Sequence, residues 1–178
     1  MTPSALKLAT GLLGAIVYAA AGAHIGSQNA GWFGLERNAN ALLPTLGVGA
    51  ALVVVAFASS TLHVRLREAG RLGRATQVLL VVGPLLYILS WLIQFAILGT
   101  LCLGIGLVCL AVAVTREKLV PVTERVLIIL SAVGSLTWNT ETVSAFLLVG
   151  VGAIWMILSI RLLYPRRIAN PRSPEPDL

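Results

Sequence analysis

Six long apolar runs alternate with short polar segments along the chain, and each run is close to the length of a membrane-spanning helix. The runs cover residues 6–23, 42–62, 75–97, 98–115, 121–138 and 143–163. An apolar helix needs about 20 residues to cross a hydrocarbon core of about 30 Å. Stretches such as 78–86 and 101–114 are apolar on every side, whereas a membrane β-barrel strand alternates polar and apolar positions. The pattern predicts an all-α integral membrane protein with a six-helix transmembrane domain over residues 1–167.

Composition supports this class. Of the 178 residues, 57% are hydrophobic and only 11% are charged, whereas a soluble domain carries about 25% charged residues. The net charge of +6 would be typical of a nucleic-acid-binding protein if the chain were soluble. Here the basic residues lie in the loops where membrane topogenesis places them. We therefore expect membrane lipids as partners and no nucleic acid.

The basic residues also predict the direction in which the chain crosses the membrane. Counted over alternate loops, 12 of the 13 Lys and Arg residues fall on one side, and only Arg37 falls on the other. Cytoplasmic loops carry the excess of Lys and Arg in multipass proteins. This predicts cytoplasmic N- and C-termini and three in–out–in hairpins. The Ala-, Leu- and Gly-rich spans, with many Arg and few Lys, resemble in composition the small multipass proteins of high-GC bacteria, which implies the plasma (inner) membrane.

Two internal boundaries are harder to place. Residues 75–115 contain no charge and would form a helix of about 60 Å, twice the hydrocarbon core, so we expect a tight turn near residues 98–100. The run 121–138 is strongly apolar only from Val126, and it spans only if it begins near Pro121, with Glu124 and Arg125 reaching back to the interface. A re-entrant hairpin is the alternative for this run.

The two ends of the chain carry their own predictions. Lys7, the apolar stretch after it and the small residues 21–23 loosely match a cleavable signal peptide. Because the positive segment holds a single Lys and the apolar stretch continues into an ordinary loop, we expect a retained first helix instead. Residues 168–178 contain three prolines and few apolar side chains, which predicts a disordered cytoplasmic tail.

Small residues recur at helical spacing on two of the runs. Such residues let membrane helices approach closely and supply much of their packing. The predicted packing positions are Gly11, Ala15 and Ala19 in the first run and Gly99, Cys102, Gly106 and Cys109 in the fourth. The two cysteines would lie about 10 Å apart on one helix, too far for a disulfide. We interpret them as packing residues and expect no metal or redox pair.

Polar and aromatic residues gather in the outer half of the third run. Tyr87, Ser90, Trp91 and Gln94 have the spacing of one helix face and follow a Gly-Pro pair. Ser135 and Trp138 occupy a similar stripe on the fifth run, and Tyr18 lies on the first. If these faces converge, they outline an outward-opening pocket. The alternative, which we favour at this stage, is that Gln94 links helices and the aromatic residues belong to the interfacial belt.

The candidate chemistry within the runs is sparse. No Asp, Glu, Lys, Arg or His lies near the middle of any run, and such groups usually mark proton relays, ion pathways and membrane enzymes. We find no catalytic set, cofactor site or metal-ligand set, and we expect no enzymatic activity. The sequence favours a structural or interaction subunit that packs with itself or with another membrane subunit. The alternative is a binder or carrier of a small neutral or apolar molecule, such as a lipid or a quinone, in an outer-leaflet pocket.

Overall fold

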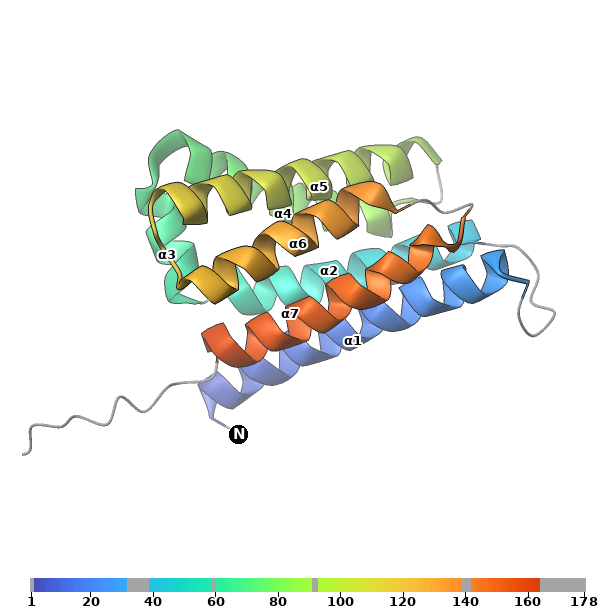
Figure 1. The fold of residues 1–178 in the computed structure, drawn as a ribbon, viewed down its shortest axis with the longest axis horizontal. Helices are drawn as coiled ribbons and strands as arrows, with labels where there is room; N and C mark the ends of the chain where they lie inside the picture. Colours follow the sequence, from blue (N-terminus) through green and yellow to red (C-terminus); the bar gives the residue numbers. More distant parts are fainter. Residues whose placement is uncertain (1, 32–38, 59, 91–92, 139–141, 164–178) are drawn as a thin grey trace, which may run out of the picture.

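The computed structural model describes residues 2–31, 39–58, 60–90, 93–138 and 142–163. Over these residues the chain forms seven α-helices and two short 3-10 helices, and no strand (Figure 1). The all-helical class predicted from the sequence is confirmed for this part of the chain. The predicted tail, residues 168–178, lies outside the described residues.

The first helix, α1 (Pro3–Asn29), is the longest, with 27 residues. Its N-terminus is set by Thr2, whose side chain accepts a hydrogen bond from the Ala5 backbone N–H, and by a proline in the first turn. The helix ends at Asn29, and Gly31 follows with a φ of +69°, a conformation that favours glycine. The apolar run 6–23 therefore lies within a helix that is longer than the run at both ends.

The second apolar run does not form one straight helix. A 3-10 turn, η2 (Ala39–Leu42), leads into α2 (Leu43–Ala58), and α3 (Thr61–Glu68) then leaves at an angle of 79°. The run 42–62 is therefore not one helix, because α2 ends at Ala58 and the last residues of the run belong to the bend and to α3. The physical reason is the amphipathic character of α3, which buries Leu62 and Leu66 and leaves its arginines exposed.

The long uncharged segment breaks earlier than expected. Helix α4 (Gly70–Ile88) ends before residue 89, and α5 (Ile93–Arg116) runs continuously through residues 98–100. The predicted turn near 98–100 was therefore wrong. The glycine that seemed to mark it, Gly99, instead lies at a helix contact, where a Cβ would be 3.1 Å from the Gly83 carbonyl oxygen of α4.

The last two helices complete the bundle. Helix α6 (Val122–Thr137) is one continuous helix that begins directly after Pro121 rather than a hairpin, and its 16 residues span about 24 Å. A second 3-10 turn, η3 (Val143–Phe146), leads into α7 (Leu147–Leu163). Glu124, which we expected to reach back to the interface, instead points its side chain into the bundle, and that side chain is 2% exposed.

The six longer helices form a closed ring. Each of these helices contacts the next one in the order α1, α2, α4, α5, α6, α7. Helix α7 contacts α1 and closes the ring. In Figure 1 they form two layers, with α4, α5 and α6 above α1, α2 and α7. Helix α3 covers one end of this ring, where it contacts α2 and α4. The ring places the interior side chains of six helices around one common core.

Within the part of the chain that the structure describes, three helical segments are long and apolar enough to cross a membrane: Pro3–Asn29, Phe95–Arg116 and Ser144–Leu163. The bent pair α2 and α3 would make a fourth if it counted as one span. These segments are compatible with a membrane protein. The remaining helices are shorter or carry charges in their first turns, as α4 does at Arg71 and Arg74.

The cations of the described residues gather at one end of the bundle. This end holds the start of α1, the α3 region, the α5–α6 connection and the end of α7 (Figure 1). The described cations there are Lys7, Arg65, Arg67, Arg71, Arg74, Arg116, Lys118, Arg125 and Arg161. We call this the basic end. The alternation along the sequence of connections rich in cations and connections with at most one cation thus corresponds to two opposite ends of the folded chain.

A candidate binding cavity in the bundle core

A cavity of about 110 Å³ lies inside the ring, and every helix except α1 contributes to its wall. Most of the lining is aliphatic, with Leu103 and Leu107 of α5, Ile128 of α6 and Leu158 of α7 among its buried residues. No charged side chain is part of the lining. A dry cavity of about 150 Å³ with similar walls can hold a benzene molecule. The space therefore suits one ring or a short piece of an aliphatic chain.

The mouth of the cavity lies between α2 and α4. Two lining residues, Ala58 of α2 and Val81 of α4, are exposed, whereas the lining residues of α5, α6 and α7 are buried or half-buried. Val81 is 49% exposed on the outer surface of the bundle, within a helix that carries no charge after Arg74. An apolar molecule could therefore enter from the side of the bundle without passing a charged residue.

Polar side chains occupy the edge of the cavity next to α3. The Gln77 side chain of α4 donates a hydrogen bond from Nε2 to the His63 carbonyl oxygen at 2.9 Å. The same nitrogen lies 3.3 Å from His63 Nδ1. Ser60, at the bend between α2 and α3, donates to the Phe57 carbonyl oxygen at 2.6 Å. These bonds fasten α3 across the basic end of the cavity.

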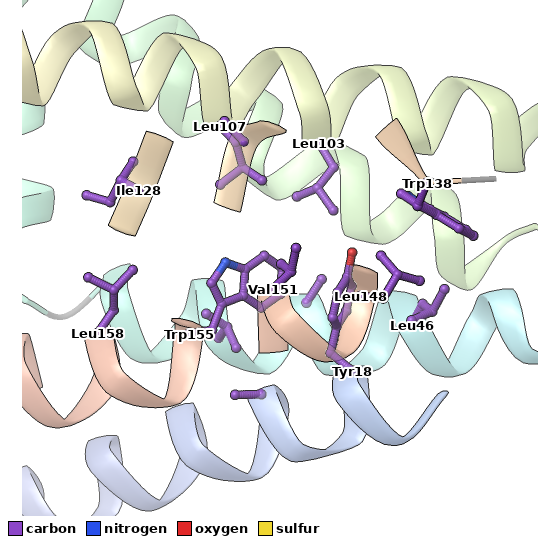
Figure 2. Close-up of a cluster of buried hydrophobic side chains, with 14 of the residues drawn as sticks. Tyr18, Leu46, Leu103, Leu107, Ile128, Trp138, Leu148, Val151, Trp155 and Leu158 are labelled. Carbon is purple, nitrogen blue, oxygen red and sulfur yellow. The ribbon is translucent and has the colours of Figure 1, made fainter. Parts of the chain in front are cut away.

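The deep wall of the cavity carries a buried indole. Trp155 of α7 donates from Nε1 to the Ser131 hydroxyl of α6 at 2.6 Å, and both residues line the cavity. The Tyr18 ring of α1 lies against the Trp155 ring, with ring centroids 4.5 Å apart and planes tilted by 40°. Figure 2 shows Trp155 and Tyr18 side by side, below Leu103 and Leu107 of the opposite layer.

The predicted polar face on the third run is divided between two helices. Tyr87 lies in the last turn of α4, Ser90 lies in the turn that follows, and Gln94 lies in the first turn of α5. These residues do not share one helix face, because the helix ends at Ile88 and the chain reverses. The Gln94 side chain and the whole of Trp91 lie outside the described residues.

Tyr87 is engaged in helix packing instead. Its hydroxyl shares a hydrogen bond of 2.7 Å with the Thr100 hydroxyl of α5. On its other side, a Cβ added to Gly47 of α2 would lie 2.7 Å from the Tyr87 Cβ. Ser135 and Trp138 are buried in the core from the α6 side, and Trp138 lies close to Tyr87. These residues converge as a group in the interior, but they are not among the residues that line the cavity.

The predicted packing residues of the first run contact a neighbouring helix of the same chain. A Cβ on Gly152 of α7 would lie 2.6 Å from the Ala19 Cβ and 2.8 Å from the Ala15 carbonyl oxygen. A Cβ on Gly11 would lie 2.8 Å from Oγ of Ser159, which also belongs to α7. Backbones that approach this closely tolerate only the smallest side chains. This face is therefore occupied by α7.

Two of the predicted packing residues of the fourth run, Gly99 and Gly106, face α4. A Cβ on Gly106 would lie 3.0 Å from the Leu79 Cβ, and Gly99 faces Gly83 and Tyr87. Cys102 and Cys109 are half-buried free thiols. Among the described residues, no three His, Cys, Asp or Glu side chains lie in a metal-binding arrangement.

A buried ion pair at the basic end was not anticipated from the sequence. Arg161 of α7 donates from Nη1 to Glu124 Oε1 at 3.2 Å; the Glu124 side chain is 2% exposed and that of Arg161 is 42% exposed. Glu124 lies in the first turn of α6, where the helix dipole favours a negative charge. In the sequence, the only signal for this ion pair was the position of Glu124 three residues after Pro121. That signal is weak, because a carboxylate in the first turn of a helix is common.

Two further arginines fasten the connection between α5 and α6. Arg65 of α3 donates to the Leu119 carbonyl oxygen at 3.2 Å, and Arg125 of α6 donates from Nε to the Val120 carbonyl oxygen at 2.7 Å. Lys118 in this connection has a φ of +49°, which is uncommon for a residue with a side chain. The basic residues therefore also hold the loops of this end together.

Comparison with known proteins gives no family for this chain: no family model matches it, and neither the curated proteins nor the solved structures include a match.

Proposed function

We propose that the chain crosses the plasma (inner) membrane six times, with both termini in the cytoplasm. The proposal is supported by the basic end, which collects nine cations of the described residues at one end of an up-and-down ring. The positive-inside rule assigns such an end to the cytoplasm. Helices α2, α4 and α6 cross with the rest because in the ring they pack against α1, α5 and α7, which contain the three candidate spans of the described residues.

Impermeant thiol labelling tests this topology. In a chain with Cys102→Ala and Cys109→Ala, a cysteine at exposed Thr142 is expected to react with a charged maleimide in intact cells. A cysteine at exposed Glu68 is expected to react only after the cells are permeabilised. The reverse pattern would place the basic end outside, and equal labelling of both sites in intact cells would contradict the six-span arrangement.

We propose that the protein binds a small, uncharged and mostly apolar molecule in the cavity of the bundle core. The observation that carries this proposal is the lining, which combines a continuous aliphatic wall with a few neutral polar groups. Such a composition is typical of small-molecule sites. The exposed mouth between α2 and α4 supports entry from the lipid, so a lipid chain or a quinone ring is the class of molecule that fits.

The cavity changes the choice between the two functions considered from the sequence. The small residues that favoured an interaction subunit already pack against other helices of the same chain, as Gly11 and Gly106 do. A role as a subunit of a larger assembly therefore stays a prediction, and these small residues do not provide a surface for it. Binding of a small molecule would give the cavity a function, and such binding requires no catalytic group.

Filling the cavity should abolish binding. We expect fluorobenzene, followed by fluorine NMR on purified protein in micelles, to bind the natural chain and to lose about tenfold or more in affinity when Leu107 is changed to Trp. The larger indole enters empty space, so the unfolding free energy should stay equal or rise by about 0.5–2 kcal/mol.

Val108 supplies the matched control for this experiment. It is the next residue of α5 and is 39% exposed, outside the lining. Val108→Trp should bind fluorobenzene as well as the natural chain does. The proposal fails if the natural chain shows no more uptake than empty micelles, or if the Leu107 variant binds equally well.

A further inference from the structure

The edge of the cavity next to α3 carries a hydrogen-bond acceptor that the protein itself does not use. It belongs to Gln77 of α4, which lines the cavity and is half-buried. The Gln77 amide nitrogen donates to the His63 carbonyl oxygen at 2.9 Å. This bond fixes the orientation of the amide, because the amide oxygen could not bond to a carbonyl. The amide oxygen, Oε1, therefore faces another direction and has no partner among the described residues.

The same amide nitrogen also fixes the tautomer of His63, a second half-buried residue of the lining. It lies 3.3 Å from Nδ1 of the imidazole ring. Because an amide nitrogen donates and does not accept, Nδ1 is the acceptor of this bond, and the ring proton lies on Nε2. Within the described part of the chain, Nε2 has no hydrogen-bond partner. The α3 edge therefore offers one unused acceptor and one unused donor, on two side chains that are bonded to each other.

The other polar side chains of the lining are already engaged. Ser60 donates its proton to a backbone carbonyl oxygen at 2.6 Å, and on the deep wall Trp155 donates to Ser131, also at 2.6 Å. The unused pair lies near the mouth, since Gln77 precedes the exposed lining residue Val81 by one turn of α4. A ligand that enters between α2 and α4 can therefore leave its polar group at this edge and place its apolar part in the cavity.

A hydroxyl group is the uncharged group that satisfies both atoms. Its oxygen can accept from Nε2 of His63, and its proton can be donated to Oε1 of Gln77. A carbonyl or ether oxygen has no proton to donate, so it would leave the Gln77 oxygen unpaired, and a hydrocarbon would leave both atoms unpaired. Polar atoms left without partners in an apolar site weaken binding. An ionic group would find no charged side chain in the lining to balance it.

We propose that Gln77 and His63 form the polar end of the binding site and hold the hydroxyl group of an uncharged alcohol or phenol whose apolar body fills the cavity. This inference rests on the proposed function and adds the chemistry of the ligand's polar end. The hydroxyl could belong to a diacylglycerol or to a quinol, the reduced form of a quinone. In either molecule, the part that exceeds the cavity extends through the mouth between α2 and α4.

Two fluorinated probes of nearly equal size test the proposal. Para-fluorophenol carries a hydroxyl group, and para-fluorotoluene has a methyl group in its place. Binding to the full-length chain in micelles is measured by fluorine NMR, with the Leu107→Trp variant as the blank for uptake by detergent. The measured quantity is the ratio of the two affinities, phenol to toluene, so that differences in detergent uptake between variants cancel.

Two variants assign the phenol affinity to the two side chains. His63→Phe removes the ring donor and keeps the backbone carbonyl that fastens Gln77, whereas Gln77→Met removes the amide at nearly the same length. Each should lower the ratio about three- to tenfold, as the loss of one neutral hydrogen bond provides, and leave the toluene affinity unchanged. His24→Phe is the matched control, because this histidine is exposed on α1 and outside the lining. That variant should keep the full ratio.

The outcomes separate this inference from the function on which it rests. If para-fluorotoluene binds the natural chain no better than the Leu107 variant, the cavity is not a binding site. If it does bind, but the ratio is the same in the natural chain and in His63→Phe, the α3 edge holds water only and the inference is overturned. Displacement of the phenol by a short-chain diacylglycerol identifies a lipid alcohol as the source of the hydroxyl, and displacement by a short-chain isoprenoid quinol identifies a quinol. Displacement by neither overturns the assignment to these hydroxyl groups.

Discussion

Replacing Gly152 with alanine is expected to destabilise the bundle, whereas the same replacement at Gly150 is expected to leave it unchanged or slightly more stable. The two glycines are two residues apart on α7, but they face different surroundings. A Cβ on Gly152 would meet the Ala19 Cβ at 2.6 Å and the Ala15 carbonyl oxygen at 2.8 Å, whereas a Cβ on Gly150 would meet nothing within 4 Å. Overpacking of this kind costs about 1–3 kcal/mol, while alanine is favoured over an exposed helical glycine by about 1 kcal/mol.

Unfolding in mixtures of SDS and a mild detergent, followed by circular dichroism, measures this difference. Gly152→Leu extends the series and should prevent α1 and α7 from packing, so that little folded protein is recovered. Gly150→Leu should remain folded, because its side chain enters open space. Equal stability of the two alanine variants would contradict the close approach of α1 and α7.

Removing Arg161 is expected to cost more stability than removing an arginine whose side chain lies mostly in solvent, such as Arg116. The change Arg161→Gln leaves the Glu124 carboxylate, 1% exposed, without this guanidinium in the core. Breaking a buried ion pair at one partner typically costs 3–5 kcal/mol. We expect about 3 kcal/mol, at the low end of that range, because the Arg161 side chain is 42% exposed and the pair is partly screened.

A double-mutant cycle isolates the pair from other effects. Glu124→Gln should cost less than Arg161→Gln, because the remaining guanidinium can reach solvent, and the double variant should be no less stable than Arg161→Gln alone. The surface pair Arg116–Glu117, 3.6 Å apart with side chains 78% and 47% exposed, is the control. Arg116→Gln should change the unfolding free energy by less than about 0.5 kcal/mol. Costs that simply add at Glu124 and Arg161 would show that the two groups act independently.

The prediction of the helices succeeded where charge or polarity changed along the chain. The basic segment around Arg116–Arg125 contains the connection between α5 and α6 as expected, whereas the one around Arg65–Arg74, expected as a loop, forms most of α3 and the start of α4. The turn after Ile88 was missed because it contains no glycine, proline or charge that could mark it. Gly99 was taken as a sign of the turn, but it serves helix packing instead. In an apolar segment a glycine can indicate either role.

The candidate site was predicted only in part. Tyr18, Tyr87, Ser135 and Trp138 do converge in the core, but the cavity lies next to them, toward the basic end rather than the outer half. Trp155 was not considered, although its indole is the central polar group of the wall. A single tryptophan on a uniformly apolar helix carries no periodic signal that separates a cavity wall from an ordinary helix contact.

By itself the sequence determined the helical class and the segregation of cations, because apolar length and loop charge are properties of consecutive residues. The tertiary structure alone decided which faces of these helices meet. On helices that are apolar all round, polarity does not distinguish a buried face from a lipid-facing one. Close approaches such as Gly152 on Ala19 and the ion pair Glu124–Arg161 depend on the shapes of residues far apart in the chain. The cavity follows from that packing, so it became visible only in three dimensions.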